Sequence, residues 1–155
     1  MTGISSKDKG MRTEIKVRDE LRSLTGLKWE RTPLSGALNA VHGLKADLYI
    51  PNEHNLYSVE VKGYADDHLT SKVLTDKEPQ LESWWKQAIR QADETNKVPL
   101  LIFKHDRGKL FSATNSLLLP LDEIGYRFMY IHHLKLYISK LEDFVKLSNP
   151  EWIRT

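Results

Sequence analysis

Hydrophobic and polar positions follow two different periods along the chain, and the change of period separates the predicted elements. After Ser5 and Ser6, and up to about Thr25 and Gly26, apolar residues fall within one half of a helical wheel. These residues are Met11, Ile15, Val17, Leu21 and Leu24. Serine suits the N-cap and glycine the position just past the end, so a helix is predicted. Glu14 lies inside the apolar half and breaks its pattern.

The next segments alternate with the period of two that is typical of strands. Residues 27–32 predict a short strand, and residues 33–45 a loop with one proline and two glycines. Residues 46–51 and 55–62 predict two strands joined by a hairpin. In the second strand, Tyr57, Val59 and Val61 share one face. Leu56, Ser58, Glu60 and Lys62 share the other.

The second half of the chain continues with a helix and a very apolar strand. Residues 63–77 predict a polar connection, and Glu78-Pro79 opens a helix with a buried stripe of Leu81, Trp85, Ala88 and Ala92. Residues 98–106 predict a strand that pairs with residues 109–113. Beyond Pro120, residues 127–133 or 134–139 could form a strand and 140–147 a terminal helix. The predicted order is α-β-β-β-α-β with a tail, in a single α/β domain spanning residues 1–155.

Composition limits the cellular compartments, metal sites and partners that are possible for this domain. The 155 residues are 40% hydrophobic, enough to bury a core, and include no apolar run long enough to span a bilayer. The start of the chain has no secretion-type apolar segment, so we expect a cytoplasmic protein. The absence of cysteine excludes thiolate metal sites but leaves oxygen ligands open. A net charge of +2 permits nucleic acid as a partner without requiring it.

The pattern acid-x-lysine occurs twice, at residues 14–16 and 60–62. On a helix, positions i and i+2 point about 200° apart, so Glu14 and Lys16 cannot converge on one target. On a strand, the same spacing places both side chains on one face. Only Glu60 and Lys62 can therefore act together.

Asp47 on the neighbouring predicted strand adds a second carboxylate beside Glu60. Two adjacent carboxylates repel each other unless a cation lies between them. Oxygen ligands suit Mg²⁺, which binds one or two carboxylates, keeps waters and contacts substrate phosphates. Lys62 could then assist attack of water on the phosphate or offset its developing charge. This combination favours phosphodiester hydrolysis, with Glu14 as a third carboxylate from the first helix.

The arrangement resembles the PD-(D/E)XK nuclease superfamily. Asp47 matches the first acid of its motif, with Ala46 where proline is frequent, and residues 60–62 match the second half. The resemblance implies a restriction-endonuclease-like α-β-β-β-α-β core, in which helices flank a central mixed sheet.

The chain is also similar to archaeal-type Holliday junction resolvases and their phage relatives. Lys9-Gly10 followed by Glu14, and the segment RTPLSG at residues 31–36, match their motifs; Ile15 departs from the arginine frequent there. This likeness covers about residues 9–62. It implies a metal site made by Glu14, Asp47, Glu60 and Val61, a catalytic Lys62, and Ser35 in a loop near the scissile phosphate.

The resemblance implies a Mg²⁺-dependent DNA endonuclease of recombination and repair, with Mn²⁺ expected to substitute. Two symmetric cuts in a four-way junction would require a homodimer. Branched or duplex DNA is the expected partner, in a bacterial, archaeal or phage-infected cell. Candidate DNA contacts are Lys9, Arg12, Arg31, Ser35 and Gln87.

Three other interpretations remain open at this stage. The protein could be a restriction-type or repair endonuclease of the same superfamily, which acts on linear duplex. It could also be a nucleic-acid-binding domain that keeps the fold without the chemistry. Taken alone, Glu60 and Lys62 could be an ion pair on a solvated strand face.

Overall fold

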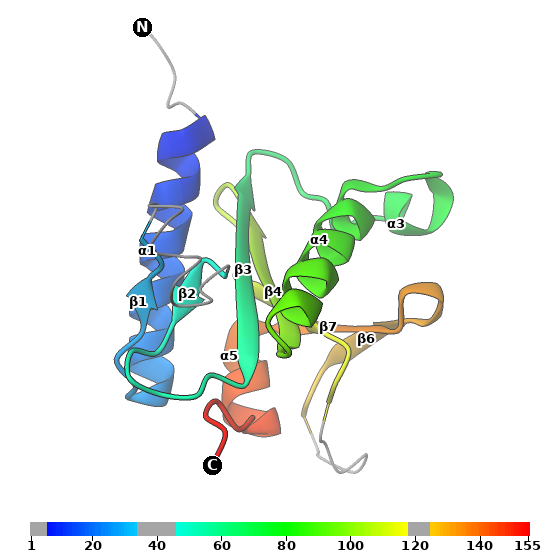
Figure 1. The fold of residues 1–155 in the computed structure, drawn as a ribbon. Helices are drawn as coiled ribbons and strands as arrows, with labels where there is room; N and C mark the ends of the chain where they lie inside the picture. The colour runs from blue at the N-terminus through cyan, green and yellow to red at the C-terminus, as the bar shows by residue number, and fades with distance from the viewer. Residues whose placement is uncertain (1–5, 34–45, 118–124) are drawn as a thin grey trace, which may run out of the picture.

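The computed structural model describes residues 6–33, 46–117 and 125–155, and Figure 1 shows their arrangement. In these ranges seven strands form one mixed sheet in the order β1-β2-β3-β4-β5-β7-β6. The strands are β1 (Glu30–Arg31), β2 (Leu48–Tyr49), β3 (Tyr57–Tyr64), β4 (Val98–His105), β5 (Phe111–Thr114), β6 (Phe128–Ile131) and β7 (Leu136–Lys140). Among the described strands, only β3 and β4 are parallel neighbours, and the other pairs are antiparallel. The predicted α/β fold with a mixed sheet is confirmed.

Helix α1 (Ser6–Thr25) covers one face of the sheet, on the side of β3 opposite α4 in Figure 1. Val17 and Leu21 are fully buried and pack in one cluster with Val59 and Val61 of β3. Gly26 ends the helix with a φ of 73°, a left-handed conformation that glycine adopts without steric cost. The predicted apolar face of β3 therefore packs against α1.

Helix α4 (Gln80–Glu94) covers the other face and connects the parallel strands β3 and β4. Its predicted stripe is buried against β4 and β5, and Trp84 next to the stripe is buried as well. Trp84 packs against Tyr64 of β3 and Phe103 of β4. Pro79 stands at the N-cap, as expected for a proline at the start of a helix.

Strand β2 is much shorter than the six residues predicted from alternation. The side chain of Asn55 accepts a hydrogen bond from the Ile50 amide and donates one to the Ile50 carbonyl. These bonds occupy the backbone of Ile50, and Asn52 turns the chain with a φ of 63°. The hairpin therefore closes directly after Tyr49.

The predicted polar connection before α4 contains one short helix, α3 (Lys72–Thr75), anchored by the buried Val73. In the tail, both candidate segments are strands, β6 and β7, separated by the 3-10 turn η1 (His132–Leu134). The terminal helix is limited to α5 (Leu141–Asp143) and the π-helical turn η2 (Phe144–Ser148). The tail thus extends the sheet beyond the α-β-β-β-α-β core.

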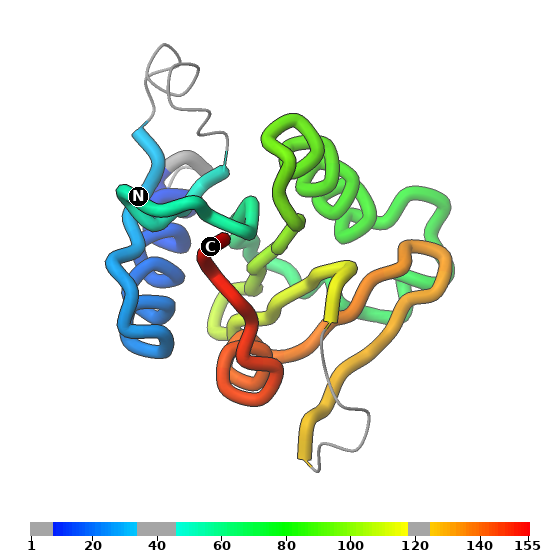
Figure 2. The backbone as a smooth tube through the Cα atoms, turned by 60° about the horizontal axis from the view of Figure 1, so that its bottom comes forward, coloured from blue at the N-terminus to red at the C-terminus, as the bar shows by residue number. Residues whose placement is uncertain are grey.

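The C-terminal segment returns to the β2–β3 turn, as Figure 2 shows. Ile153 forms an isolated bridge with Asn55, and the Arg154 amide donates to the His54 carbonyl. Trp152 packs against Trp29 and Tyr57. This contact joins the C-terminal segment and the segment after α1 to the start of β3. No helix in the described ranges is long and apolar enough to cross a membrane.

Candidate active site

A cavity of about 520 Å³ lies between α1, β3 and α4. Its lining residues are Lys9, Gly10, Glu14, Asp47, Glu60, Val61, Lys62, Gly63, Tyr64, Ala65, Gln87 and Gln91. Glu60 and Lys62 reach it because the β3–β4 register pairs them with Leu101 and Phe103, which face α4. The two residues therefore share the face that is not packed against α1.

Asp47 is fixed by the backbone of β3. Its amide donates to the Val59 carbonyl at 2.8 Å, and its Oδ2 accepts a hydrogen bond from the Val61 amide at 2.8 Å. The residue pairing between β2 and β3 ends at Leu48 and Val59. Beyond this point the carboxylate of Asp47 takes the place of a strand partner, which holds it at the edge of β3 beside Glu60.

Glu60 is only 3% exposed and shares a hydrogen bond with the carboxyl group of Asp47. Burial, followed by the negative charge of Asp47, raises the pKa of Glu60 to about 9. Burial also raises the pKa of Asp47, although the Val61 amide lowers it. At neutral pH and without a cation, the two carboxyl groups therefore hold a proton between them.

Two cations act on this carboxyl pair. The Lys62 ammonium lowers the pKa of Glu60 and Asp47, although burial outweighs it. Arg31 of β1 lies with its Nε 3.6 Å from Glu14 Oε1. Burial and the charge of Asp47 raise the pKa of Glu14, and Arg31 partly offsets them. The three carboxylates thus share one electrostatic environment.

Gly63, which sequence reasoning did not select, allows α1 to approach β3. A Cβ atom at this position would overlap the side chain of Thr13. Thr13 is buried, and its hydroxyl donates to the Lys9 carbonyl at 2.9 Å. Since Glu14 is the next residue, this close approach positions Glu14 at the cavity. In the sequence, a glycine directly after Lys62 is the feature that could have indicated this close approach.

The oxygen atoms at this site fit a magnesium ion that is bound by few protein ligands. Asp47 and Glu60 supply two adjacent carboxyl groups, and the amide and carbonyl of Val61 lie on the same edge of the strand as Asp47. The described residues contain no group of three acidic or histidine side chains able to hold an ion. Mg²⁺ is commonly bound by one or two carboxylates with water and phosphate. Glu14, paired with Arg31, therefore remains only a predicted ligand.

The other predicted residues lie at different distances from this cavity. Gln87 lines it, and so does Gln91, whose buried Oε1 has no hydrogen-bond partner in the described chain. Lys9 lines it and also forms an ion pair with Asp106 at 2.9 Å. Arg12 is exposed on α1 and lines a separate hollow. Ser35 lies outside the described residues.

Comparison with known proteins gives two matches. Residues 5–155 match the family described as "Phage putative PDDEXK endonuclease". The chain is 40% identical to Protein D14 of Escherichia phage T5 over 153 residues, which cover 97% of this chain and 92% of that protein. No solved structure matches significantly.

The raised pKa of Glu60 makes stability depend on pH. A folded-state pKa of about 9 means that the folded chain keeps a proton which the unfolded chain loses near pH 4.5. The free energy of unfolding therefore falls as pH rises from 5 to 8. Glu60→Gln removes this dependence. From pH 5 to pH 8, the free energy of unfolding of the variant should therefore rise relative to that of the wild type by at least about 1.4 kcal/mol, which corresponds to one pKa unit.

Urea unfolding in EDTA at pH 5 and pH 8 measures this difference. Glu78→Gln, a change at an exposed glutamate before α4, is the matched control and should follow the wild type at both pH values. An equal stability difference between Glu60→Gln and wild type at pH 5 and pH 8 would contradict the shared proton.

A divalent cation should replace that proton. At pH 8, Mg²⁺ at ten times its dissociation constant should stabilise the wild type by about 1.4 kcal/mol, because it binds only the folded chain. Thermal unfolding with and without Mg²⁺ reports this as a rise in Tm. Glu78→Gln should show the same rise and Glu60→Gln a much smaller one. Equal rises in all three proteins would mean that the ion binds elsewhere.

Proposed function

This chain belongs to the family of phage PD-(D/E)XK endonucleases, and on that basis we propose that it is a Mg²⁺-dependent DNA endonuclease that resolves four-way junctions. One observation carries the proposal: the carboxyl groups of Asp47 and Glu60 adjoin each other in a cavity that Lys62 also lines. A buried pair of this kind is costly without a cation and is suited to binding one.

In the proposed reaction, water attacks the phosphorus of one phosphodiester and the DNA oxygen leaves on the opposite side. Bound Mg²⁺ would lower the pKa of water and offset the charge on the phosphate. Asp47 and Glu60 would hold the ion, and the Val61 amide keeps Asp47 in place. Lys62 lies two residues beyond Glu60 on the same strand face, where its ammonium can contact a phosphate oxygen or orient the attacking water.

Glu14 lines the cavity, and Arg31 of β1 is its ion-pair partner. Arg31 is three-quarters buried, and its Nε lies 3.6 Å from Glu14 Oε1. The planar guanidinium group of an arginine can bind a phosphate through two N–H donors. In our proposal Arg31 contacts the DNA backbone beside the cut, and Glu14 sets its position.

Junctions are proposed as the substrate because of the residues that resemble the resolvases. Lys9, Gly10 and Glu14 lie on α1 at the cavity, which supports their assignment as part of the site. A four-way junction requires two symmetric cuts, and hence two active sites related by a two-fold axis. In a phage this enzyme would act on replicating or recombining DNA in the infected cell.

Strand β6 supports a homodimer. It is the last strand in the sheet order, so one of its edges has no strand partner in the described chain. Phe128, Met129 and Tyr130 on this strand are 40%, 51% and 44% exposed. Adjacent exposed apolar side chains on an edge strand are typical of a contact surface. We place the proposed subunit contact there.

Cleavage of labelled DNA tests the proposed activity. With Mg²⁺, the wild type should cut a four-way junction faster than a linear duplex of the same sequence. Glu60→Gln and Lys62→Ala should each lower the cleavage rate by at least about 10²-fold, because the first weakens metal binding and the second removes a cation that acts on the reacting phosphate or on the attacking water. Binding of the junction should be largely retained.

Three outcomes would change the proposal in different ways. Cleavage by Lys62→Ala at the wild-type rate would show that the cavity is not the active site. Equal cutting of junction and duplex would support a restriction-type or repair endonuclease. Junction binding with no Mg²⁺-dependent cleavage by the wild type would support a binding domain. Glu78→Gln should cut like the wild type.

Light scattering tests the proposed dimer. The chain mass is 18.0 kDa, and the wild type should measure about twice that value. Met129→Glu should shift the protein to monomers, because a charge would then be buried at the contact. Leu74→Glu is the matched control, since Leu74 on α3 is also exposed, at 76%. A monomeric wild type, or a dimeric Met129→Glu, would contradict the placement on β6.

A further inference from the structure

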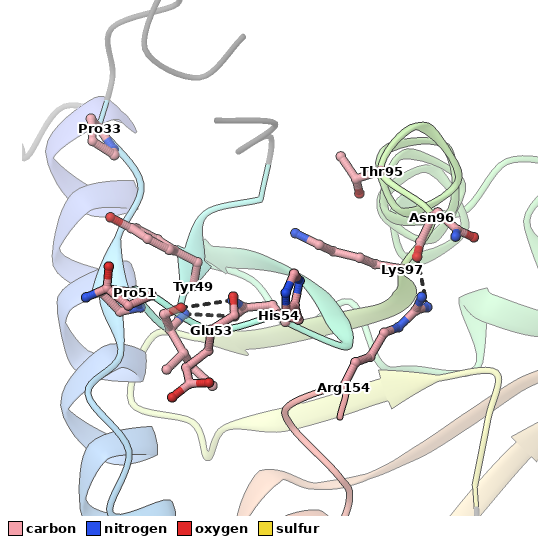
Figure 3. A pocket seen from close by; sticks show the side chains of 12 residues that line it. Pro33, Tyr49, Pro51, Glu53, His54, Thr95, Asn96, Lys97 and Arg154 are labelled. Atoms are coloured by element: carbon pink, nitrogen blue, oxygen red, sulfur yellow. Dashed lines mark hydrogen bonds between the residues drawn. The ribbon is translucent and has the colours of Figure 1, made fainter. Parts of the chain in front are cut away.

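A second cavity, of about 650 Å³, lies at the C-terminal end of α4 beside the β2–β3 turn, and Figure 3 shows it. Its lining residues are Pro33, Tyr49, Ile50, Pro51, Asn52, Glu53, His54, Asn55, Thr95, Asn96, Lys97 and Arg154. The side chain of Lys97 extends into the space towards Tyr49, and the ring of His54 stands between Tyr49 and Arg154. None of these residues takes part in the site described above.

The charge in this cavity is mainly positive. Burial, followed by the charge of Arg154, lowers the pKa of Lys97. Arg154 donates through Nη2 to the Asn96 carbonyl at 2.9 Å, which leaves other N–H groups available. The carboxylate of Glu53 points away from Lys97 in Figure 3. A half-buried lysine beside an arginine is suited to an anion.

The two cavities have common walls. Asp47 lines the first and Tyr49 the second, and both lie on the face of the β2 segment opposite the buried Leu48. Gln91 lines the first and Thr95 the second, one helical turn apart on α4, and the Thr95 hydroxyl donates to the Gln91 carbonyl. The two cavities are therefore neighbours along the β2 segment and α4.

The register of the sheet gives the separation. Tyr57 pairs with Val98, so Lys97 lies level with Leu56, four residues before Glu60. Four residues of strand span about 13 Å. Along a DNA duplex, successive phosphates of one strand advance about 3.4 Å along the axis, so this distance corresponds to roughly four nucleotides. The second cavity is thus within reach of the strand that is cut.

We propose that Lys97 and Arg154, with His54, form a binding site for a backbone phosphate of the cleaved DNA strand, about four nucleotides from the scissile phosphate. The proposal rests on the nuclease function for the identity of the strand, whereas anion binding at the cavity does not depend on cleavage. Such a contact fixes the register of the strand on the enzyme.

Phosphate-neutralised DNA tests this site. A set of junctions carries one uncharged methylphosphonate at successive positions around the cut, and dissociation constants are measured in EDTA to prevent cleavage. For the wild type, one position about four nucleotides from the cut should weaken binding about ten-fold, the loss of one charged hydrogen bond. Lys97→Gln should weaken binding of unmodified DNA by a similar factor and be insensitive to neutralisation at that position.

Controls separate a phosphate contact from a change in fold or net charge. Lys77→Gln removes the same charge from an exposed lysine before α4 and should bind like the wild type. Lys97→Arg should retain most of the affinity. Lys97→Gln should also reduce the salt dependence of binding by about one phosphate contact. Circular dichroism of each variant excludes unfolding.

The outcomes distinguish this site from the nuclease function. Equal binding by Lys97→Gln and Lys77→Gln would overturn the phosphate site even if the wild type cleaves DNA. A Lys97-dependent response to one methylphosphonate, in a protein that shows no cleavage, would support the site and overturn the proposed function. A response spread evenly over all positions in the wild type would overturn the site, because it would indicate a diffuse positive surface.

Discussion

The burial of two adjacent carboxyl groups at the edge of β3 is the constraint on which the candidate site depends. Asp47 and Glu60 share a hydrogen bond, and burial together with their mutual repulsion raises the pKa of Glu60 to about 9. A proton or a divalent cation can relieve the repulsion. The cavity beside them gives room for the cation and for a phosphate. The two carboxyl groups that are costly to bury are thus also the groups that are suited to binding a cation.

The surrounding backbone maintains this costly arrangement. Strand β2 begins only at Leu48, which pairs with Val59, so the Val61 amide has no strand partner and is satisfied by the side chain of Asp47. On the other side, Gly63 lets Thr13 pack directly on β3, which brings Glu14 to the same cavity. At Val61 a carboxylate replaces the strand partner, and at Gly63 the missing side chain leaves room for Thr13. Each of these contacts orients a carboxylate. Local irregularity is therefore what positions the site on an otherwise ordinary sheet.

The sequence predicts those features that depend on side-chain period. The two faces of β3 follow from strict alternation, and the placement of Glu60 and Lys62 towards α4 follows from the apolar character of Val59 and Val61. The length of β2 does not follow, because it is set by hydrogen bonds from Asn55 that no periodicity records. Trp84 is buried off the predicted stripe because β3 and β4 extend beneath it, which is a tertiary effect. Contacts between distant segments, such as Arg31 with Glu14, also need the fold.

Net charge gives little information about where this protein would bind DNA. The whole chain carries only +2, yet Lys97 and Arg154 lie together in a cavity whose one carboxylate points away from Lys97. Arg154 reaches it because the C-terminal segment pairs with the β2–β3 turn, about a hundred residues earlier in the chain. Since solvent screens charges beyond about 10 Å, the local arrangement of charge matters more for binding a phosphate than the net charge of the chain. In our proposal, neighbouring cavities with carboxylates in one and cations in the other would bind metal and backbone in separate places, and this separation would fix where a strand lies relative to the ion.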